Sequence, residues 1–538
     1  MSTQMLVRNR WERWAGLFAR LRPGEGRAVL YFMLYGFLVM FSYYMLKTLR
    51  EPLLLSKASA ETKSYAYAVI ALVLLAVVPA YSALYQRLPR RQFSLWVGAL
   101  LLFVQLAFFL LSQAGVGIGF AYYVWVGIFG VVITAQFWAF AADTFNVKTG
   151  KRVFPLIMIG VSLGGLVGPA LAGQLFQALG TRGLMLIILA LIGLTLPIAE
   201  LARAAVPAMS RSSQIATRPL KNSLLGGFSL VLGNRYLLLI AGMIVLLNWV
   251  NTTGEYLLAQ LVIDHVDGLI ATDPGLDKSA LIAGFYGNFF SIVNALSLLL
   301  QMFLVSRVIA RVGVRGALLI LPVIALAGYG LMVFMPIFGM IRLVKIVENA
   351  TDYSLMNTAR HSLFLPLAPV EKYQAKMAID AFFWRFGDLV QALAVYIGLN
   401  LLDFQARQFA ILNMALAVLW VVLAVQIGRR YLSLERVASP GEPPRLVQAL
   451  PARQLAPGAA LLYQLPPNLF HCEPGDILEI SVRPVDADKL PSWLRFDPET
   501  LTLSGRPPAD ITGSTWLTIR ATNFEGQWAE TRLGILHQ

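Results

Sequence analysis

The chain has 538 residues, of which 57% are hydrophobic and 14% charged, with a net charge of +15. An ordinary soluble domain is about 25% charged, so this composition, with a mean hydropathy of +0.66, excludes a cytosolic globular enzyme. The single cysteine, Cys472, excludes a disulfide scaffold. The composition is that of a polytopic membrane protein.

Apolar stretches long enough to cross a bilayer, about 20 residues each, recur in chain order. We expect twelve spans, at 28–48, 65–86, 94–112, 118–143, 153–178, 182–202, 236–262, 280–304, 314–335, 339–363, 377–402 and 406–428. They divide the chain into a basic cytoplasmic segment 1–27, a first six-helix half 28–202, a central cytoplasmic linker 203–235 and a second six-helix half 236–430. The predicted fold is therefore an all-α bundle of six plus six membrane-spanning helices.

Positive charge is concentrated at alternate connections between these stretches. Residues 440–538 hold 8 Lys+Arg and 11 Asp+Glu, which leaves +18 for the rest of the chain. That excess lies in the N-terminal segment and in short loops, so the positive-inside rule places both termini in the cytoplasm. This distribution sets membrane orientation and excludes nucleic acid as a partner. Arg- and Ala-rich usage without a transit peptide indicates a bacterial inner membrane.

The C-terminal part has a different pattern. Residues 431–457 are Pro-rich and are expected to form a linker. Short alternating runs then predict strands at 461–465, 477–483, 493–496, 501–504, 514–523 and 527–536. Residues 458–538 are thus expected to form a small all-β sandwich. The segment KLPSWLRFDPETLTLSGRP (489–507) resembles the immunoglobulin-like and dystroglycan-type cadherin-like domains, which implies a module that binds a protein partner.

Charged residues inside a membrane are costly and face a cavity or one another. The first group ends the first apolar stretch: Lys47 and Arg50 share a helix face, with Tyr43 and Tyr44 behind them and Glu51 beside them. An aromatic-backed cationic contact for an anionic substrate is one interpretation. Snorkelling of both side chains to the membrane interface is the other.

The second group lies in the tenth stretch. Lys345, Glu348, Asp352 and Arg360 follow one another at helical spacings, with Tyr353 among them. These spacings align the four along one broad stripe, which must face the bundle interior. The stripe could bind substrate or form an internal ladder of ion pairs.

The remaining intramembrane charges are more isolated. Asp380, Arg385 and Asp388 lie in the eleventh stretch, where Arg385 and Asp388 could form a structural bridge, a gate or a ligand site. Asp143 and Glu255 are single acids in the fourth and seventh stretches. Either could carry a coupling proton, since burial would raise its pKa, or could serve at a helix end or a gate.

Enzymatic motifs are missing from the sequence. It has no P-loop and no metal-binding histidine or cysteine pattern, so we expect no catalytic residues, no metal and no cofactor. The partners that we expect are the lipid bilayer and a small anionic substrate.

Three stretches resemble the nucleotide transporter (ATP/ADP translocase) family of intracellular bacteria and plastids. They are YYMLKTLREPLLL (43–55), QFWAFAADTFNVKTGKRVFPLIMIGVSLGGLVGPALAG (136–173) and YSLMNTARHSLFLPLAPVEKYQAKMAIDAFFWRFGD (353–388). The resemblance implies the major facilitator fold with its twelve helices, and exchange of nucleoside triphosphate for diphosphate, with basic residues of helices 1 and 10 on the phosphates. Arg50 and Arg360 stand where that family usually has lysine, and arginine keeps the charge.

Together these features predict a carrier of an organic anion, for which we favour a nucleotide. Residues expected at the substrate are Lys47, Arg50, Arg360, Tyr43, Tyr44, Tyr353 and Lys345. Residues expected in gating or charge pairs are Glu51, Glu348, Asp352, Asp380, Arg385 and Asp388, and those considered for coupling are Asp143 and Glu255. The alternatives are a proton-coupled carrier or lipid flippase with another cargo, and a non-transporting scaffold that acts through its β domain.

Overall fold

The computed structural model describes residues 25–538, with the exception of 146, 207–223, 336, 368–374, 439–443, 457, 472–477, 488–489, 499, 523–526 and 538. It divides into two compact units, 1–434 and 435–538. Most of the predicted segment 1–27, much of the linker 203–235, and Cys472 fall outside the described residues.

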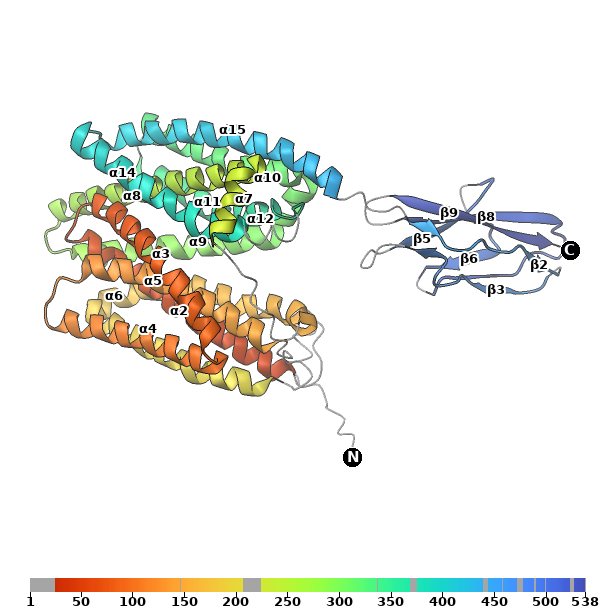
Figure 1. The fold of residues 1–538 in the computed structure, drawn as a ribbon, viewed down its shortest axis with the longest axis horizontal. Helices are drawn as coiled ribbons and strands as arrows, with labels where there is room; N and C mark the ends of the chain where they lie inside the picture. The colour runs from red at the N-terminus through yellow and green to blue at the C-terminus, as the bar shows by residue number, and fades with distance from the viewer. Residues whose placement is uncertain are drawn as a thin grey trace. The chain divides into compact units, whose positions relative to one another are not determined.

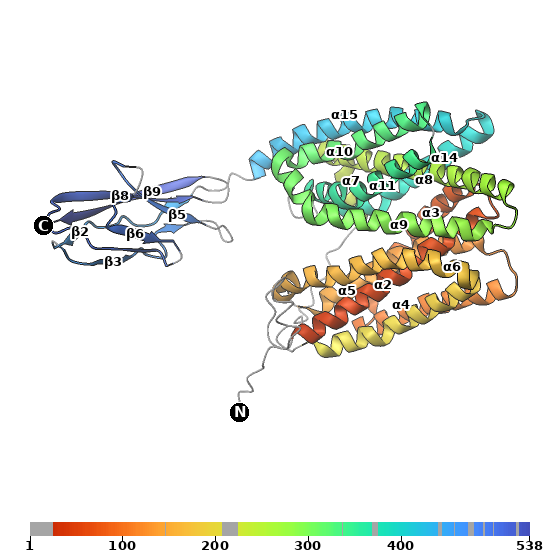
Figure 2. The ribbon, with the colours of Figure 1, turned by 180° about the vertical axis from the view of Figure 1, so that it is seen from behind.

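The first unit is a bundle of long helices (Figure 1). The first half contains α2 (Glu25–Leu55), α3 (Glu61–Arg87), α4 (Arg90–Gln113), α5 (Gly119–Thr144) and α6 (Val147–Ala205). The second half contains α7 (Leu224–Gly233), α8 (Arg235–Thr272), α9 (Lys278–Phe303), α10 (Val305–Phe334), α11 (Phe338–Thr351), η2 (Asp352–Met356), α12 (Asn357–Ser362), η3 (Ile379–Phe383), α14 (Trp384–Leu401) and α15 (Ala406–Ala438). Figures 1 and 2 show the two halves as separate groups of helices.

Within the described residues, 10 helices are long and apolar enough to cross a membrane. The longest, α6, contains two helices that meet at Gly180, whose φ of 62° lies in the left-handed region that glycine tolerates. The segment α11–η2–α12 forms one more helix of membrane length, which is more charged than the others because it carries Arg342, Lys345, Glu348, Asp352 and Arg360. The predicted arrangement of twelve spans is confirmed. The short helix α7 is an addition, since it lies inside the predicted linker 203–235.

Glycines set the closest helix contacts of the first half. A methyl group on Gly160 or Gly164 of α6 would clash with the carbonyl oxygens of Met33 and Phe37 of α2. Because glycine has no side chain, the two backbones approach closely enough to pack as one unit.

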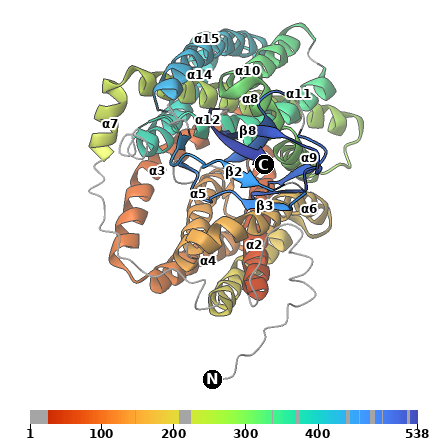
Figure 3. The same cartoon turned by 90° about the vertical axis from the view of Figure 1, so that its right-hand side faces the viewer.

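The two halves meet along two seams. In one seam, α6 packs on α9, where the Asn294 side chain donates a hydrogen bond of 2.6 Å to the Gly165 carbonyl (Figure 3). In the other seam, between α3 and α14, Gln391 Nε2 donates to Ser64 Oγ over 3.0 Å. We call the end of the bundle that contains Leu55 the Leu55 end and the opposite end the Glu25 end. The α6–α9 seam runs from Gly165 and Asn294, near the middle, toward the Leu55 end, where Gly173 meets Gly287. The α3–α14 seam lies on the same side of the middle.

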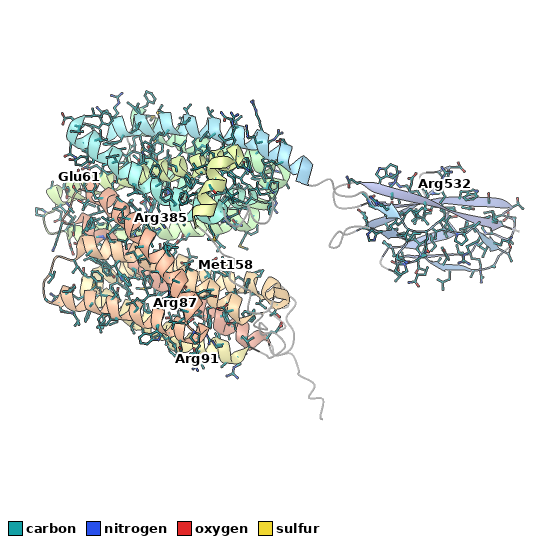
Figure 4. The ribbon with its side chains drawn as sticks, viewed as in Figure 1. Glu61, Arg87, Arg91, Met158, Arg385 and Arg532 are labelled. Atoms are coloured by element: carbon teal, nitrogen blue, oxygen red, sulfur yellow. The ribbon has the colours of Figure 1, made fainter. Side chains whose placement is uncertain are left out.

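Toward the Glu25 end the same helix faces become exposed. Met158 and Gln301 lie seven residues, or about two helical turns, beyond the contacting pair Gly165 and Asn294 on α6 and α9. Both side chains are exposed. Figure 4 labels Met158 on the side of the first half that faces the second. The halves are therefore joined at the Leu55 end and separate toward the Glu25 end.

The second unit is a small β domain. Its sheets have the strand orders β2–β9–β8–β5, β3–β7–β6 and β1–β4. The strands are β1 (Arg445–Leu446), β2 (Arg453–Leu455), β3 (Leu461–Gln464), β4 (Phe470–His471), β5 (Glu479–Pro484), β6 (Leu494–Asp497), β7 (Thr502–Gly505), β8 (Gly513–Thr522) and β9 (Trp528–His537). Leu503, Leu517 and Ile535 are fully buried between the sheets. The predicted small all-β domain is confirmed.

The predicted linker 431–457 is longer than the structure allows. Its first residues continue α15, and β1 and β2 lie inside it. Strand β2 pairs in parallel with β9, and β1 pairs with β4. These strands are only two or three residues long and stand among prolines, so no alternating pattern marks them in the sequence.

Candidate functional site

Five ionisable side chains meet between α2, α3 and α8 in the interior, and we call them the central charge cluster: Lys47, Arg50, Glu51, Lys63 and Glu255. Glu51 is fully buried, and its Oε1 lies 3.3 Å from Arg50 Nε. The Arg50 guanidinium also lies over the Tyr123 ring, 4.1 Å from its centroid. Tyr123 Oη donates to Glu51 Oε1 over 3.2 Å. The Glu51 carboxylate is therefore fixed within the first half.

Lys63 joins the two halves. Its ammonium nitrogen lies 3.1 Å from Glu51 Oε2 and 3.2 Å from Glu255 Oε2. Glu51 and Lys63 belong to the first half and Glu255 to the second, so this ion pair crosses the boundary. Asn349 Nδ2 donates to the other Glu255 oxygen over 3.3 Å. Because Lys63 is fully buried, the pairs are shielded from water.

The sequence analysis did not predict a role for Lys63. It lies in the first turn of α3, in the predicted connection between the spans 28–48 and 65–86, where a lysine at the membrane interface is ordinary. The only signal in the sequence was positive charge on the unexpected side. The connection after the first span carries Lys57 and Lys63, whereas the other connections on that side are poor in lysine and arginine.

Lys47 has a different environment from Lys63. Its ammonium group lies 4.3 Å from the ring centroid of Phe290, 5.4 Å from that of Tyr44 and 5.8 Å from that of Tyr353. It also donates a long hydrogen bond of 3.5 Å to Tyr353 Oη. No ion pair joins Lys47 to a carboxylate in the part of the chain that the structure describes. Lys47 is thus a cation surrounded by aromatic rings, with Tyr43 packed against Tyr44 behind it.

Arg360 is the corresponding cation of the second half. Its guanidinium stacks on Trp384 of α14, 4.6 Å from the ring centroid. Its Nη2 donates to the Asn357 side chain over 3.1 Å. The buried Nε has no hydrogen-bond partner, and no ion pair to Arg360 occurs among the described residues. A buried donor without a partner is costly, so the site favours a further acceptor, which the described residues do not supply.

The tenth helix does not continue as one regular α-helix through the predicted stripe. The helix passes through a π turn at Asp352–Met356, whose wider turn changes the rotation of everything after it. Lys345 is fully buried and pairs with Glu348 over 2.9 Å. Asp352 and Arg360, in and beyond the π turn, are partly exposed. For Lys345 and Glu348 the arrangement is that of an internal ion pair.

A second π turn, Ile379–Phe383, follows the first α-helical residues, 375–378, of the eleventh span and contains Asp380, which is partly exposed. Asp388, one turn into α14, is buried and accepts hydrogen bonds from Asn248 at 2.7 Å and Thr252 at 3.1 Å, both on α8. Its other oxygen lies 3.3 Å from Arg385 Nη1. Of the alternatives left open by the sequence, this geometry favours a structural bridge between α14 and α8.

Removal of the Asp388 carboxylate should therefore reduce stability. In Asp388→Ala the Asn248 and Thr252 donors and the Arg385 charge lose their acceptor, which costs about 2–4 kcal/mol. Denaturation of the purified protein in mild detergent should show a lower unfolding midpoint. Asp380→Ala, on the same helix, is the matched control and should stay within about 0.5 kcal/mol. Equal midpoints for the two variants would contradict the bridge.

Asp143 lies apart from the cluster. It ends α5 near the Glu25 end, where Tyr85 Oη donates to its oxygens over 2.9 and 3.1 Å. Glu255, the other acid considered for proton coupling, is held by Lys63 and Asn349. The structure thus brings together Lys47, Arg50, Glu51 and Glu255 with Tyr353. The Lys345–Glu348 pair lies beside them, since Lys345 Nζ lies against Gly254, the neighbour of Glu255, and Asp143 is left outside.

Comparison with known proteins supplies a fold for each unit. Residues 443–535 match the family described as "Putative Ig domain". No curated protein matches the chain.

Three solved structures resemble the helical unit. A bacterial homologue of the human lysosomal transporter Spinster, in an inward-facing and unoccupied conformation, is 13% identical with a TM-score of 0.51, covering 77% of this chain and 99% of its own. A POT family transporter in complex with 5-aminolevulinic acid is 13% identical with a TM-score of 0.56, covering 75% and 96%.

The nucleoside transporter NupG is 14% identical with a TM-score of 0.52, covering 76% of this chain and 98% of its own. The helical unit has the major facilitator fold. In such a fold two six-helix bundles meet around a central site. Here the two seams join the halves, and the central charge cluster lies between them.

Proposed function

We propose that the chain is a secondary transporter that moves an organic anion by alternating access, and we favour a nucleotide as the cargo. The observation that carries the proposal is a pair of cations, Lys47 in the first half and Arg360 in the second, to which the described residues supply no carboxylate partner. Each stands beside aromatic rings. Ammonium and guanidinium groups bind phosphate oxygens, and aromatic rings stack on bases.

The spacing of the two cations supports an elongated cargo. Arg360 follows Tyr353, the neighbour of Lys47, by seven residues, which is about 10 Å along the helix. Arg360 can hold two phosphate oxygens at once, whereas Lys47 contributes a point charge. A nucleotide would place its phosphates toward Arg360 and Lys47 and its base among Tyr43, Tyr44 and Tyr353. Arg50 is left to gating in this arrangement, because Glu51 and Tyr123 already hold its guanidinium.

Alternating access is supported by the way the halves join. With the N-terminus in the cytoplasm, the Leu55 end is the outer end, and the central charge cluster closes it through Lys63. The cargo site would then be open toward the cytoplasm. Reopening of the outer end requires that Lys63 and Glu255 separate.

The proposal is tested by uptake of labelled ATP into liposomes that contain the purified protein, with and without ADP inside. We expect uptake that depends on internal ADP. The double variant Lys47→Gln with Arg360→Gln should lower uptake about 100-fold or more at low ATP, since it removes two charge-assisted contacts worth about 1.5–3 kcal/mol each. Arg307→Gln, at an exposed arginine of α10, should transport normally.

Normal uptake by the folded double variant would refute the assigned site. Absence of ATP uptake, together with cation-dependent uptake of another phosphorylated anion, would refute the nucleotide and leave the carrier intact. Failure of every anion would refute the transporter itself.

A further inference from the structure

A polar groove of about 240 Å³ lies between α6 and α9, near the Leu55 end. Gly173 and Gly284 form its hollow, since they carry no side chains to fill it. Its polar lining consists of Gln174 and Gln177 from α6 and Asn288 and Ser291 from α9. The groove thus has one wall from each half of the bundle, and neither wall belongs to the central charge cluster.

The groove opens toward the bilayer. Leu171 and Ile292, which flank the polar residues on the same helix faces, are 36% and 40% exposed. The side of α9 that faces the interior instead carries Phe290, which is buried beside Lys47. Asn288 lies ten residues after the start of α9, which is about 15 Å from the helix end.

Exposed amides on the same face as an exposed leucine and isoleucine are unusual. Gln174, Gln177 and Asn288 are all exposed, and polar groups that face hydrocarbon are costly unless they are hydrogen-bonded. The described part of the chain provides no hydrogen-bond partner for the side chains of Gln174 and Gln177. A polar group from outside the chain would satisfy them.

A positive charge lies beside these amides. Arg342 Nη2, in the second turn of α11, donates to Asn288 Oδ1 over 2.5 Å, and its guanidinium lies 5.3 Å from the Phe285 ring centroid. No carboxylate pairs with Arg342 within the described ranges. Because the Asn288 oxygen accepts from Arg342, its amide NH₂ remains for another acceptor. The groove therefore offers hydrogen-bond donors and one cation, which is a site for a phosphate oxygen.

We propose that this groove binds a phospholipid, with its phosphate at Arg342, Asn288 and Gln177 and an acyl chain along Leu171 and Ile292. The lipid phosphate supplies the acceptors that the amides lack, and the acyl chain covers the exposed apolar residues. Because the two walls belong to different halves, the bound lipid bridges them. It therefore stabilises the conformation in which the halves are joined at the Leu55 end.

Native mass spectrometry of the full-length protein in detergent tests this site without any transport assay. Phosphatidylglycerol is titrated and the bound lipid is counted. We expect a saturable phosphatidylglycerol complex and none with diacylglycerol, which has the same tails and no phosphate. Arg342→Gln should weaken the complex about tenfold, as expected for loss of a charge-assisted hydrogen bond. Arg91→Gln, at an exposed arginine that pairs with Glu200 on the first half, should bind as the unaltered protein does.

Three results would overturn the proposal. Equal binding of diacylglycerol would reduce the site to an apolar surface. Equal binding by Arg342→Gln would remove the phosphate from it. Displacement of the lipid by millimolar inorganic phosphate would assign the groove to a free anion. Gln177→Leu breaks no hydrogen bond among the described residues. It provides a second variant should Arg342→Gln fail to fold, and it too should weaken the complex.

Discussion

Lys63→Gln should open the outer end of the bundle and lower transport more than tenfold. The substitution leaves Glu51 and Glu255 as buried carboxylates without their shared cation, and an uncompensated buried charge costs about 3–5 kcal/mol. Ser64 is 1% exposed beside Lys63, so a cysteine there reports on closure. In a Cys472→Ser background, labelling of Ser64→Cys by a maleimide should accelerate when Lys63→Gln is added.

Two variants separate loss of this contact from loss of the fold. Lys57→Gln, an exposed lysine six residues earlier, should leave labelling and transport unchanged. Lys63→Gln combined with Glu255→Gln removes the unpaired charge of the second half and should restore slow labelling, while Glu51 keeps Arg50. Slow labelling in the single variant Lys63→Gln would show that the ion pairs do not hold the outer end closed.

A short bis-methanethiosulfonate cross-link between Ser64→Cys and Gln391→Cys should stop transport almost completely. The Gln391 and Ser64 side chains meet across the seam of α3 and α14, at 3.0 Å, and both are buried; a cysteine is shorter than glutamine, so a linker spans the difference. A cross-linked pair fixes the halves in the joined state, so the cargo site reaches only one side of the membrane. Uptake should return when a reductant is added, and each single cysteine should transport under both conditions.

The matched control pair is Met158→Cys with Gln301→Cys. These residues occupy the same faces of α6 and α9 as the contacting pair Gly165 and Asn294, but they are exposed toward the Glu25 end. They should not cross-link while the outer end is closed. They should cross-link once Lys63→Gln shifts the protein to the other conformation. Rapid cross-linking of this pair in the unaltered background would contradict separation of the halves at the Glu25 end.

Most of the fold follows from the sequence because hydropathy and charge act over whole helices. Each predicted span overlaps a helix of the structure, including the break at Gly180, where only the Leu-Gly-Thr-Arg connection interrupts the apolar pattern. The strands of four or more residues were predicted for the same reason, since alternation needs several residues to be visible. Strands β1, β2 and β4 were missed because they are held by pairing with distant strands rather than by a local pattern.

The candidate site was less predictable, because its residues act across helices. A sequence locates Lys47, Arg50, Glu51 and Glu255 as intramembrane charges, but it cannot show that Lys63 lies between two of these acids. Nor can it distinguish Lys345, neutralised by Glu348, from Arg360, which has no such partner. That difference depends on a π turn, and a π turn has no pattern of its own in an apolar helix.

The π turns also bear on how such a protein can change its cargo. A turn of this kind holds one residue more than an α-helical turn, which is the change that one inserted residue would make. One insertion or deletion rotates every later side chain of that helix by about 100° relative to its neighbours. The Asp352–Met356 turn precedes Arg360, and the Ile379–Phe383 turn precedes Trp384, so the stacked pair depends on both. A single codon gained or lost in either helix would therefore present a new set of side chains to the interior, a larger step than any one substitution provides.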